Sequence, residues 1–175
     1  MSDTNELVAI VNDKNEVVEA LPRAEMRQKR LPHRAVYILV LNHKHELFVQ
    51  KRTDTKDIYP GHFDIAAGGV VLSGESWEQA AKRELLEELG IRADLTPLFE
   101  FHHVTENNDV WGMSYLCLHE GPFVLQAEEV AEGGFMKLQD IWEMARQHPF
   151  TLDGLALFQL FMHHYTNQKI NALKS

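Results

Sequence analysis

The sequence predicts an α+β domain in which a mixed sheet is layered between helices. Short segments that alternate polar and apolar residues, or that are rich in β-branched and aromatic residues, recur along most of the chain. Such segments are typical of half-buried and buried strands. One long segment without glycine or proline interrupts them, and two more helical segments follow near the C-terminus. Strands with one central helix and C-terminal helices favour a layered α/β/α arrangement.

The N-terminal part of the chain predicts a small extension. Leu7–Val11 and Val17–Ala20 flank a polar turn, which is the pattern of a β-hairpin. The charged segment Arg23–Arg30 is compatible with a short helix. We therefore expect residues 1–30 to form a hairpin and a short helix, and residues 31–175 to form the main domain.

The main domain carries six further strand patterns and three helix patterns. The expected strands are Ala35–Leu41, Leu47–Lys51, Phe63–Ala67, Leu98–Val104, Trp111–Leu118 and Phe135–Lys137. The expected helices are Ser76–Leu89, Ile141–Gln147 and Asp153–His164. Gly90 is well placed to end the first of these helices, because glycine readily adopts the left-handed conformation of a helix C-terminus. Asp153 is a candidate cap for the last helix.

Composition excludes several classes of protein. The 175 residues are 45% hydrophobic and 25% charged, which suits one globular domain with a real core. The net charge of −9 disfavours non-specific nucleic-acid binding, because an acidic surface repels phosphate backbones. Cys117 is the only cysteine, so an intramolecular disulfide and a cysteine-built zinc site are excluded. The sequence shows neither a signal peptide nor an apolar run of the ~18 residues that span a bilayer, so we expect a cytoplasmic protein without membrane contact.

Three acidic residues of the expected central helix, Glu84, Glu87 and Glu88, stand at positions i, i+3 and i+4. Their carboxylates therefore share one face of the helix. Like charges repel each other there, and a hard divalent cation with oxygen ligands would reverse that penalty. An isolated acidic pair would be typical of a solvated helix face, but the wider pattern indicates metal binding. The opposite face carries apolar side chains that can pack on a sheet, namely Trp77, Ala81, Leu85 and Leu89.

Residues before the acidic triplet complete the pattern. Gly69 suits a backbone carbonyl that must approach a metal closely, because no side chain obstructs it. Arg83 and Glu75 are a candidate bidentate ion pair that would tie the loop to the helix. The expected chemistry is magnesium-assisted reaction at a diphosphate.

The segment Gly69–Ile91 matches the catalytic box of the Nudix family at every defined position. The resemblance implies a Nudix α/β/α sandwich and a pyrophosphohydrolase. Its small-molecule substrate would be a nucleoside diphosphate linked to another moiety, and its cofactor Mg²⁺, with Mn²⁺ as a substitute. The resemblance assigns the metal to the Gly69 carbonyl and to the carboxylates of Glu84, Glu87 and Glu88. It gives supporting roles to Glu75, Arg83 and Gly90, with Arg83 also orienting the catalytic helix.

Nudix enzymes often add one acidic residue from a later loop, as a metal ligand or general base. The resemblance therefore directs attention to the acidic segment before the last expected strand. Glu129 is the better candidate there, and Glu128 and Glu132 are alternatives. A solvated acidic loop without a catalytic role is equally compatible with this segment.

Residues before the box resemble isopentenyl-diphosphate isomerases, so isomerase-type activity is the alternative function. In these isomerases a cysteine and a metal-binding histidine occupy the positions of Ala67 and Gly69 here, and Met26 stands at the spacing of another histidine. An alanine cannot transfer a proton, which favours hydrolase chemistry on an isomerase-like scaffold. The whole chain also resembles a group of bacterial Nudix hydrolases related to these isomerases. The motifs similar to the isomerases are His33-Arg34-Ala35, Gln50-Lys51-Arg52, Lys56-Asp57 and Tyr59-Pro60-Gly61.

Four residues before the box are candidates for substrate binding: His33, Arg34, Lys51 and Arg52. Cationic side chains suit phosphate oxygens. His33 could equally cap a strand, and the other three could lie on a solvated face. A non-catalytic ligand sensor on the same scaffold is a third hypothesis, which the intact box disfavours. The N-terminal hairpin is a plausible element for a homodimer.

Overall fold

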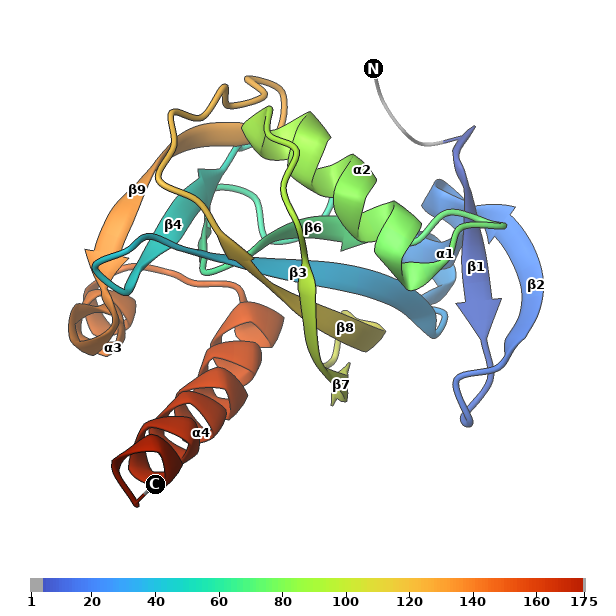
Figure 1. The fold of residues 1–175 in the computed structure, drawn as a ribbon. Coiled ribbons are helices and arrows are strands. Elements are labelled where there is room, and N and C mark those ends of the chain that lie inside the picture. The colour runs from blue at the N-terminus through green and yellow to red at the C-terminus, as the bar shows by residue number, and fades with distance from the viewer. Residues whose placement is uncertain (1–4, 175) are drawn as a thin grey trace.

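The structure, a computed structural model, describes residues 5–174, with side chains described through residue 168. A mixed nine-stranded sheet forms the middle layer of the described residues. Helix α2 (Trp77–Leu89) crosses one face of the sheet, while α3 (Leu138–Gln147) and α4 (Leu152–Lys174) lie on the opposite side (Figure 1). The predicted α+β sandwich is therefore confirmed.

The main-domain strands are β3 (His33–Leu41), β4 (Glu46–Arg52), β5 (Phe63–Asp64), β6 (Ala67–Val70), β7 (Thr96–Val104), β8 (Asp109–Leu118) and β9 (Val130–Lys137). Strand β3 is central, pairing in parallel with β8 and antiparallel with β6. Strand β7 continues the sheet beyond β8, and β4 pairs with both β5 and β9. This connectivity brings β6, which leads to the box, against the middle of β3.

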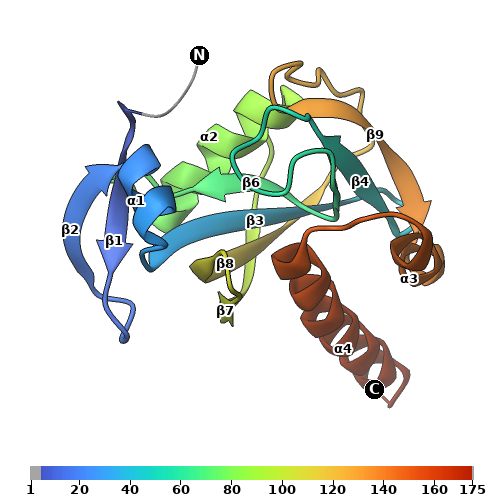
Figure 2. The ribbon, with the colours of Figure 1, turned by 180° about the vertical axis from the view of Figure 1, so that it is seen from behind.

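The N-terminal segment forms the predicted hairpin and helix: β1 (Leu7–Val11), β2 (Val17–Pro22) and α1 (Arg23–Lys29). Strand β1 joins the sheet where Ile10 pairs with His33 of β3. Met26 of α1 is buried against Val8, Ile10 and Val70. The hairpin and α1 therefore pack directly on the end of the sheet that carries β6 (Figure 2). Residues 1–4 of the expected extension lie outside the described residues.

Helix α2 begins and ends where its local sequence predicts. Ser76 accepts a hydrogen bond from the backbone of Gln79, and the Gln79 side chain accepts one from the Ser76 backbone, which is a complete capping box. Gly90 ends the helix with φ of 68°, which confirms the helix end predicted at this glycine. The face of α2 packed on the sheet comprises Ala80, Ala81, Leu85 and Leu89. These contacts leave Glu84 and Glu88 of α2 facing β6.

Several predicted elements have other bounds in the structure, and one predicted cap is wrong. Helix α4 extends to Lys174, well beyond the expected end at His164. The expected strand Phe63–Ala67 is divided at Ile65 and Ala66, because β5 pairs with β4 and β6 pairs with β3. Strand β9 starts at Val130, earlier than expected, because its glycine-containing half pairs with β4. Asp153 lies within the first turn of α4, where its carboxylate accepts a hydrogen bond from the Tyr37 hydroxyl at 2.6 Å.

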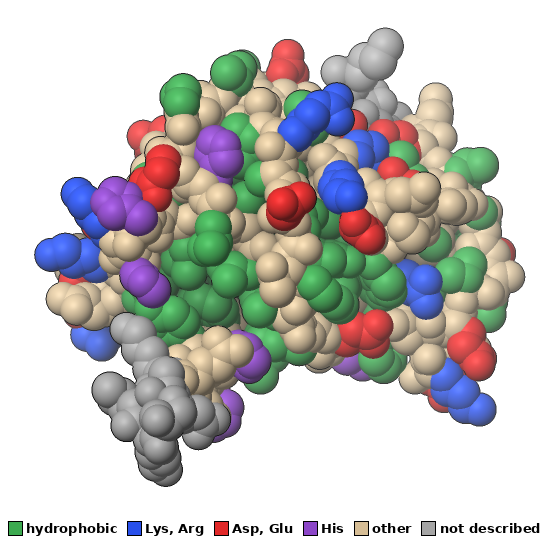
Figure 3. Space-filling model, in the orientation of Figure 1, with side chains coloured by type: hydrophobic (Ala, Val, Ile, Leu, Met, Phe, Trp, Pro, Cys, Tyr) green, Lys and Arg blue, Asp and Glu red, His purple; other side chains and the backbone are tan. Residues whose placement is uncertain are grey.

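On the surface seen in the orientation of Figure 1, acidic and basic side chains are interspersed with hydrophobic ones, at its edges and in its middle (Figure 3). The face drawn there thus presents mixed charge. In the part of the chain that the structure describes, no helix combines the length and apolar character required to traverse a bilayer.

Candidate active site

The box carboxylates lie where α2 faces β6. Glu84 and Glu88 are buried, with exposed fractions of 6% and 2%, whereas Glu87 is exposed to a larger degree. A side chain at Gly69 would overlap Glu84, because an added β-carbon would meet its Oε1 at 2.6 Å. Glycine at position 69 therefore leaves room for the Glu84 carboxylate, and the approach of the Gly69 carbonyl to a metal stays a prediction.

Glu88 is held by groups outside α2. Its Oε2 accepts hydrogen bonds from Gln50 Nε2 at 3.0 Å and from the Gly68 backbone amide at 3.1 Å. Gln50 is buried, and its Oε1 has no protein partner among the described residues. Gln50 belongs to one of the isomerase-like motifs, but the sequence assigns it no role, because nothing local distinguishes it from other strand glutamines.

Arg83 forms the expected bidentate ion pair with Glu75. Its Nε and Nη2 donate to the two Glu75 oxygens at 2.6 and 2.9 Å, and Nη2 also reaches the Val70 carbonyl. Its Nη1 donates to Glu84 at 2.7 Å and to Glu87 at 3.2 Å. Arg83 therefore connects the loop before α2 to two of the acidic residues.

The electrostatics of the site favour a cation. Burial, followed by the charge of Glu88, raises the pKa of Glu84, and Arg83 only partly opposes this. Burial also raises the pKa of Glu88, with Gln50 and Lys56 opposing. Buried oxygen donors of this kind fit Mg²⁺ chemically.

The oxygen donors predicted to bind the metal are not grouped around one metal position in this structure. Within the described residues no three acidic, histidine or cysteine side chains are grouped to hold a metal ion, and Glu87 is turned toward Arg83. Metal binding by Gly69, Glu84, Glu87 and Glu88 therefore stays a prediction. It would require Glu87 to leave Arg83.

The three loop carboxylates have different surroundings. Glu129 forms an ion pair with Lys56 at 2.5 Å, and this cation holds the pKa of Glu129 below its usual range although burial opposes the effect. The charge of Glu129 also contributes to the raised pKa of Glu88, so it faces the box. Glu128 supplies only its carbonyl to Thr53, and Glu132 is exposed. Glu129 is therefore the best placed of the three.

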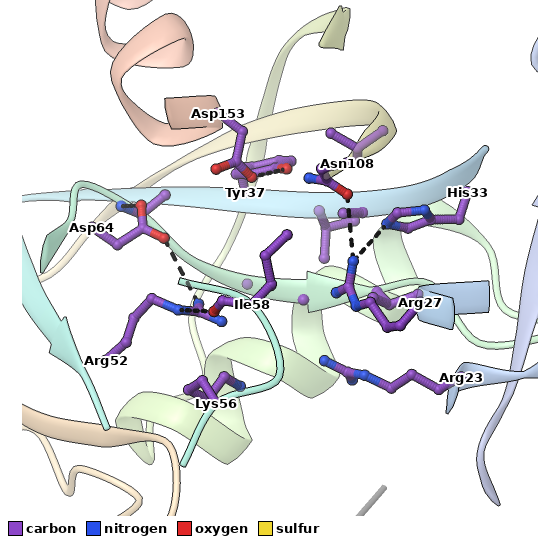
Figure 4. A pocket seen from close by; sticks show the side chains of 17 residues that line it. Arg23, Arg27, His33, Tyr37, Arg52, Lys56, Ile58, Asp64, Asn108 and Asp153 are labelled. Carbon is purple, nitrogen blue, oxygen red and sulfur yellow. Dashed lines mark hydrogen bonds and ion pairs between the residues drawn. The ribbon is translucent and has the colours of Figure 1, made fainter. Parts of the chain in front are cut away.

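A pocket of about 50 Å³ lies beside Gly69 (Figure 4). Its cationic side chains come from three segments: Arg23 and Arg27 from α1, Arg52 from β4, and Lys56 from the following loop. Asp57 accepts hydrogen bonds from Arg23 at 3.0 Å and from Arg27 at 3.1 Å. Although burial opposes it, the charges of the two arginines lower the pKa of Asp57. One carboxylate thus fixes both arginines toward the pocket.

The sequence did not identify Arg23 and Arg27. Their spacing of i and i+4 places both on one face of a short helix, which was the available signal. That spacing does not reveal which part of the main domain the helix faces.

Of the four substrate-binding candidates, Arg52 and His33 line this pocket. Arg34 instead donates to the side chain and carbonyl of Asn15 and packs over the Trp77 ring. Lys51 lies over the Phe63 ring and does not line the pocket. Arg34 and Lys51 therefore contact residues outside this pocket, and their substrate-binding roles stay a prediction.

His33 lies behind Arg27, with an exposed fraction of 2%. Its Nδ1 donates to the Leu31 carbonyl at 2.9 Å, which leaves Nε2 to face Arg27 Nη1 at 3.5 Å as an acceptor. Burial, followed by the charge of Arg27, lowers the pKa of His33 to about 3. His33 is thus a neutral side chain that positions Arg27.

This environment makes stability depend on pH. The folded pKa lies below the ordinary value of 6.5, so the stabilisation is complete above pH 6.5 and is lost as pH falls toward 3. We expect His33 to account for a loss of about 2–3 kcal/mol by pH 4.5. In urea titrations, the difference in unfolding free energy between the wild type and His33→Asn should shrink between pH 7 and 4.5. The same substitution at the exposed His163 serves as control, and a pH-independent difference would contradict the burial argument.

The position of Ala67 offers no isomerase chemistry. Ala67 is buried and pairs with Ile38 in the sheet. Cys117 is a free cysteine in the core under α2, among the side chains that pack against Leu85. Burial raises the pKa of its thiol to about 11, so it is not an activated nucleophile.

Comparison with known proteins identifies the family. The profile of the NUDIX domain matches residues 31–158. The chain belongs to the Nudix family. A protein described as "Uncharacterized Nudix hydrolase PA4841" from Pseudomonas aeruginosa is 40% identical over 158 residues, which is 90% of this chain and 94% of that protein. "Uncharacterized Nudix hydrolase YfcD" from Escherichia coli K12 is 41% identical over 162 residues, covering 91% and 88% respectively.

Solved structures share the Nudix fold. DR0079 from Deinococcus radiodurans superposes with a TM-score of 0.78 at 24% identity, covering 88% of this chain and 98% of its own. The NUDIX domain of Shewanella oneidensis NrtR, solved with ADP ribose, has a TM-score of 0.63 at 17% identity and covers 83% and 99%. These likenesses concern the fold alone. Nudix hydrolases in general cleave pyrophosphate bonds with Mg²⁺ or Mn²⁺.

Proposed function

We propose that this Nudix hydrolase cleaves the diphosphate linkage of a nucleoside diphosphate joined to another moiety, with Mg²⁺ as cofactor. The observation that carries the proposal is the position of the box beside a cationic pocket. Glu84 is buried next to Gly69 and Glu88 next to Gly68, and both glycines also line the pocket. A phosphate group bound by the cations would therefore lie next to the acidic residues.

The side chains of the pocket and of the box have separate roles in this proposal. Arg23, Arg27 and Lys56 would bind phosphate oxygens, because fixed cations in a partly enclosed site stabilise developing negative charge. Glu84, Glu87 and Glu88 would hold the cation, which supplies charge neutralisation and a reactive water. Glu129, fixed by Lys56, is the candidate for taking a proton from that water.

The test is a hydrolysis assay on the full chain. The panel should include ADP-ribose, dinucleoside polyphosphates, nucleotide sugars, coenzyme A and nucleoside triphosphates, with products resolved by mass. We expect turnover of at least one anhydride, abolished by a chelator and restored by Mg²⁺ or Mn²⁺. Ribose 5-phosphate, which has no anhydride, is the negative control. Absence of turnover across the panel, or conversion of isopentenyl diphosphate to its isomer, would overturn the proposal.

A further inference from the structure

The pocket has an acidic end opposite Arg23 and Lys56. Three side chains form this end, which we call the pocket floor: Tyr37 from β3, Asp64 from β5 and Asp153 from α4. In Figure 4 they lie on the far side of the cavity from Arg23 and Lys56. None of the three belongs to the residues predicted to bind the metal, although the charge of Glu88 acts on Asp64.

Each carboxylate of the floor has only one hydrogen-bond donor among the described residues. Asp153 has an exposed fraction of 9%, and while its Oδ2 accepts from the Tyr37 hydroxyl at 2.6 Å, its buried Oδ1 has no partner in the described structure. Asp64 has an exposed fraction of 6%, with a long 3.3 Å bond from the Ala66 amide and Arg52 at 3.9 Å. A buried acceptor without a donor costs about 1–3 kcal/mol, so the floor is incomplete as it stands.

The fold brings this acidic pair together through a glycine. A β-carbon on Gly154, in the first turn of α4, would meet Asp64 Oδ1 at 2.7 Å. The absence of a side chain at this position lets the start of α4 approach Asp64 closely. Burial, followed by the charge of Asp153, raises the pKa of Asp64, which agrees with two carboxylates sharing one site.

The side chains that line the pocket limit what can bind there. Tyr37 is the aromatic side chain of the lining, and its ring already packs against Phe101 at 5.1 Å between centroids. The lining therefore offers no free ring on which a nucleobase could stack, but it offers acceptors for small donors.

We propose that Asp64, Asp153 and Tyr37 bind the hydroxyl groups of a small polyol or sugar-like moiety, whose phosphate lies against Arg27 and Lys56. This inference rests on the proposed function and specifies it: the moiety attached to the diphosphate is hydroxylated, and a nucleobase lies outside this cavity. Hydroxyls suit the floor because each can donate to a carboxylate, and the neutral group costs less to bury than an ammonium.

Binding of three phosphate monoesters with equal chain length tests the proposal without turnover. Glycerol 3-phosphate carries two hydroxyls, propyl phosphate carries none, and 3-aminopropyl phosphate carries an ammonium. Calorimetry on the full chain should show glycerol 3-phosphate binding at least about ten-fold tighter than propyl phosphate, the factor expected for hydrogen bonds to a charged acceptor.

Asp153→Asn provides the matched variant. The amide oxygen of the asparagine can still accept the hydrogen bond from the Tyr37 hydroxyl. Its NH₂ group then stands in place of Oδ1, the acceptor without a partner, and cannot accept a hydrogen bond. We expect the preference for glycerol 3-phosphate to fall to about two-fold or less, with propyl phosphate binding unchanged. Tyr37→Phe is a second variant, and Asp140→Asn, an exposed aspartate in the first turn of α3, is the control.

The outcomes separate this inference from the hydrolase proposal. Equal binding of the first two esters, no binding of either, or tighter binding of propyl phosphate would show that the floor is internal to the fold. A preference for 3-aminopropyl phosphate would replace the polyol by an ammonium ligand and overturn the assignment. The wild-type comparison alone suffices if a variant does not fold. Preferred binding of glycerol 3-phosphate without hydrolysis of any anhydride would contradict only the hydrolase proposal. Hydrolysis without that preference would contradict only this inference.

Discussion

Glu88→Gln should abolish diphosphate hydrolysis while leaving the fold intact. Removal of a residue that only supports a metal ligand lowers metal affinity or activity by about 10–100-fold. Loss of a proposed ligand should therefore reduce kcat/KM by more than about 100-fold. The amide is nearly isosteric, and its oxygen can still accept from Gln50 or from the Gly68 amide. The substitution also removes the buried negative charge of Glu88, which repels the charge of Glu84.

The control for this variant is Glu78→Gln on the same helix. Glu78 is exposed and pairs only with Lys82 at 2.6 Å, in the i, i+4 arrangement of a surface ion pair. Steady-state kinetics with saturating Mg²⁺ should leave this control within about two-fold of the wild type. Denaturant titrations should show Glu88→Gln at least as stable as the wild type. Retained turnover in a folded Glu88→Gln protein would remove Glu88 from the metal-binding assignment.

Gly68→Ala should be among the most destabilising single substitutions in the chain. Gly68 has φ of 151°, a backbone conformation that L side chains rarely adopt. An added β-carbon would overlap the carbonyl oxygen of Val36 in the adjacent strand. Because this oxygen belongs to the backbone, no flexible side chain can move to relieve the overlap. Strain and overlap together should lower the free energy of unfolding by more than about 3 kcal/mol.

Gly134→Ala is the matched control, because Gly134 also lies in a strand and a β-carbon there would meet nothing within 4 Å. Its unfolding free energy should stay within about 0.5 kcal/mol of the wild type. Chemical denaturation of both variants gives the comparison directly. Similar stabilities for the two variants would show that β6 can move away from β3 at little cost.

The part of the site that could be predicted is the part encoded locally. The capping box at Ser76, the stop at Gly90 and the spacing of the acidic residues all lie within one helix and its flanks. The Arg83–Glu75 pair spans eight residues and was predicted from the same segment. Helix periodicity and cap chemistry suffice for such features because they do not depend on the rest of the fold.

The pocket could not be predicted in this way, because its residues come together only through the sheet. Asp64 and Asp153 belong to separate elements, and local preference pointed Asp153 to a helix cap instead of toward Tyr37. Strand alternation separates Arg34 from His33, but only the packed layers show that the pocket lies on the His33 side. Contacts across more than a hundred residues leave no local pattern in the sequence.

The Asp57 clamp on Arg23 and Arg27 has a consequence for how such an enzyme can change. The three acidic residues of the box lie in one helix, whereas the pocket beside them draws two of its cations from a segment before residue 31, where the match to the family profile begins. Exchanging the N-terminal hairpin and helix should therefore change how the protein binds phosphate groups while the acidic residues of the box stay in place. Asp57 would have to be kept in such an exchange, because it holds both arginines.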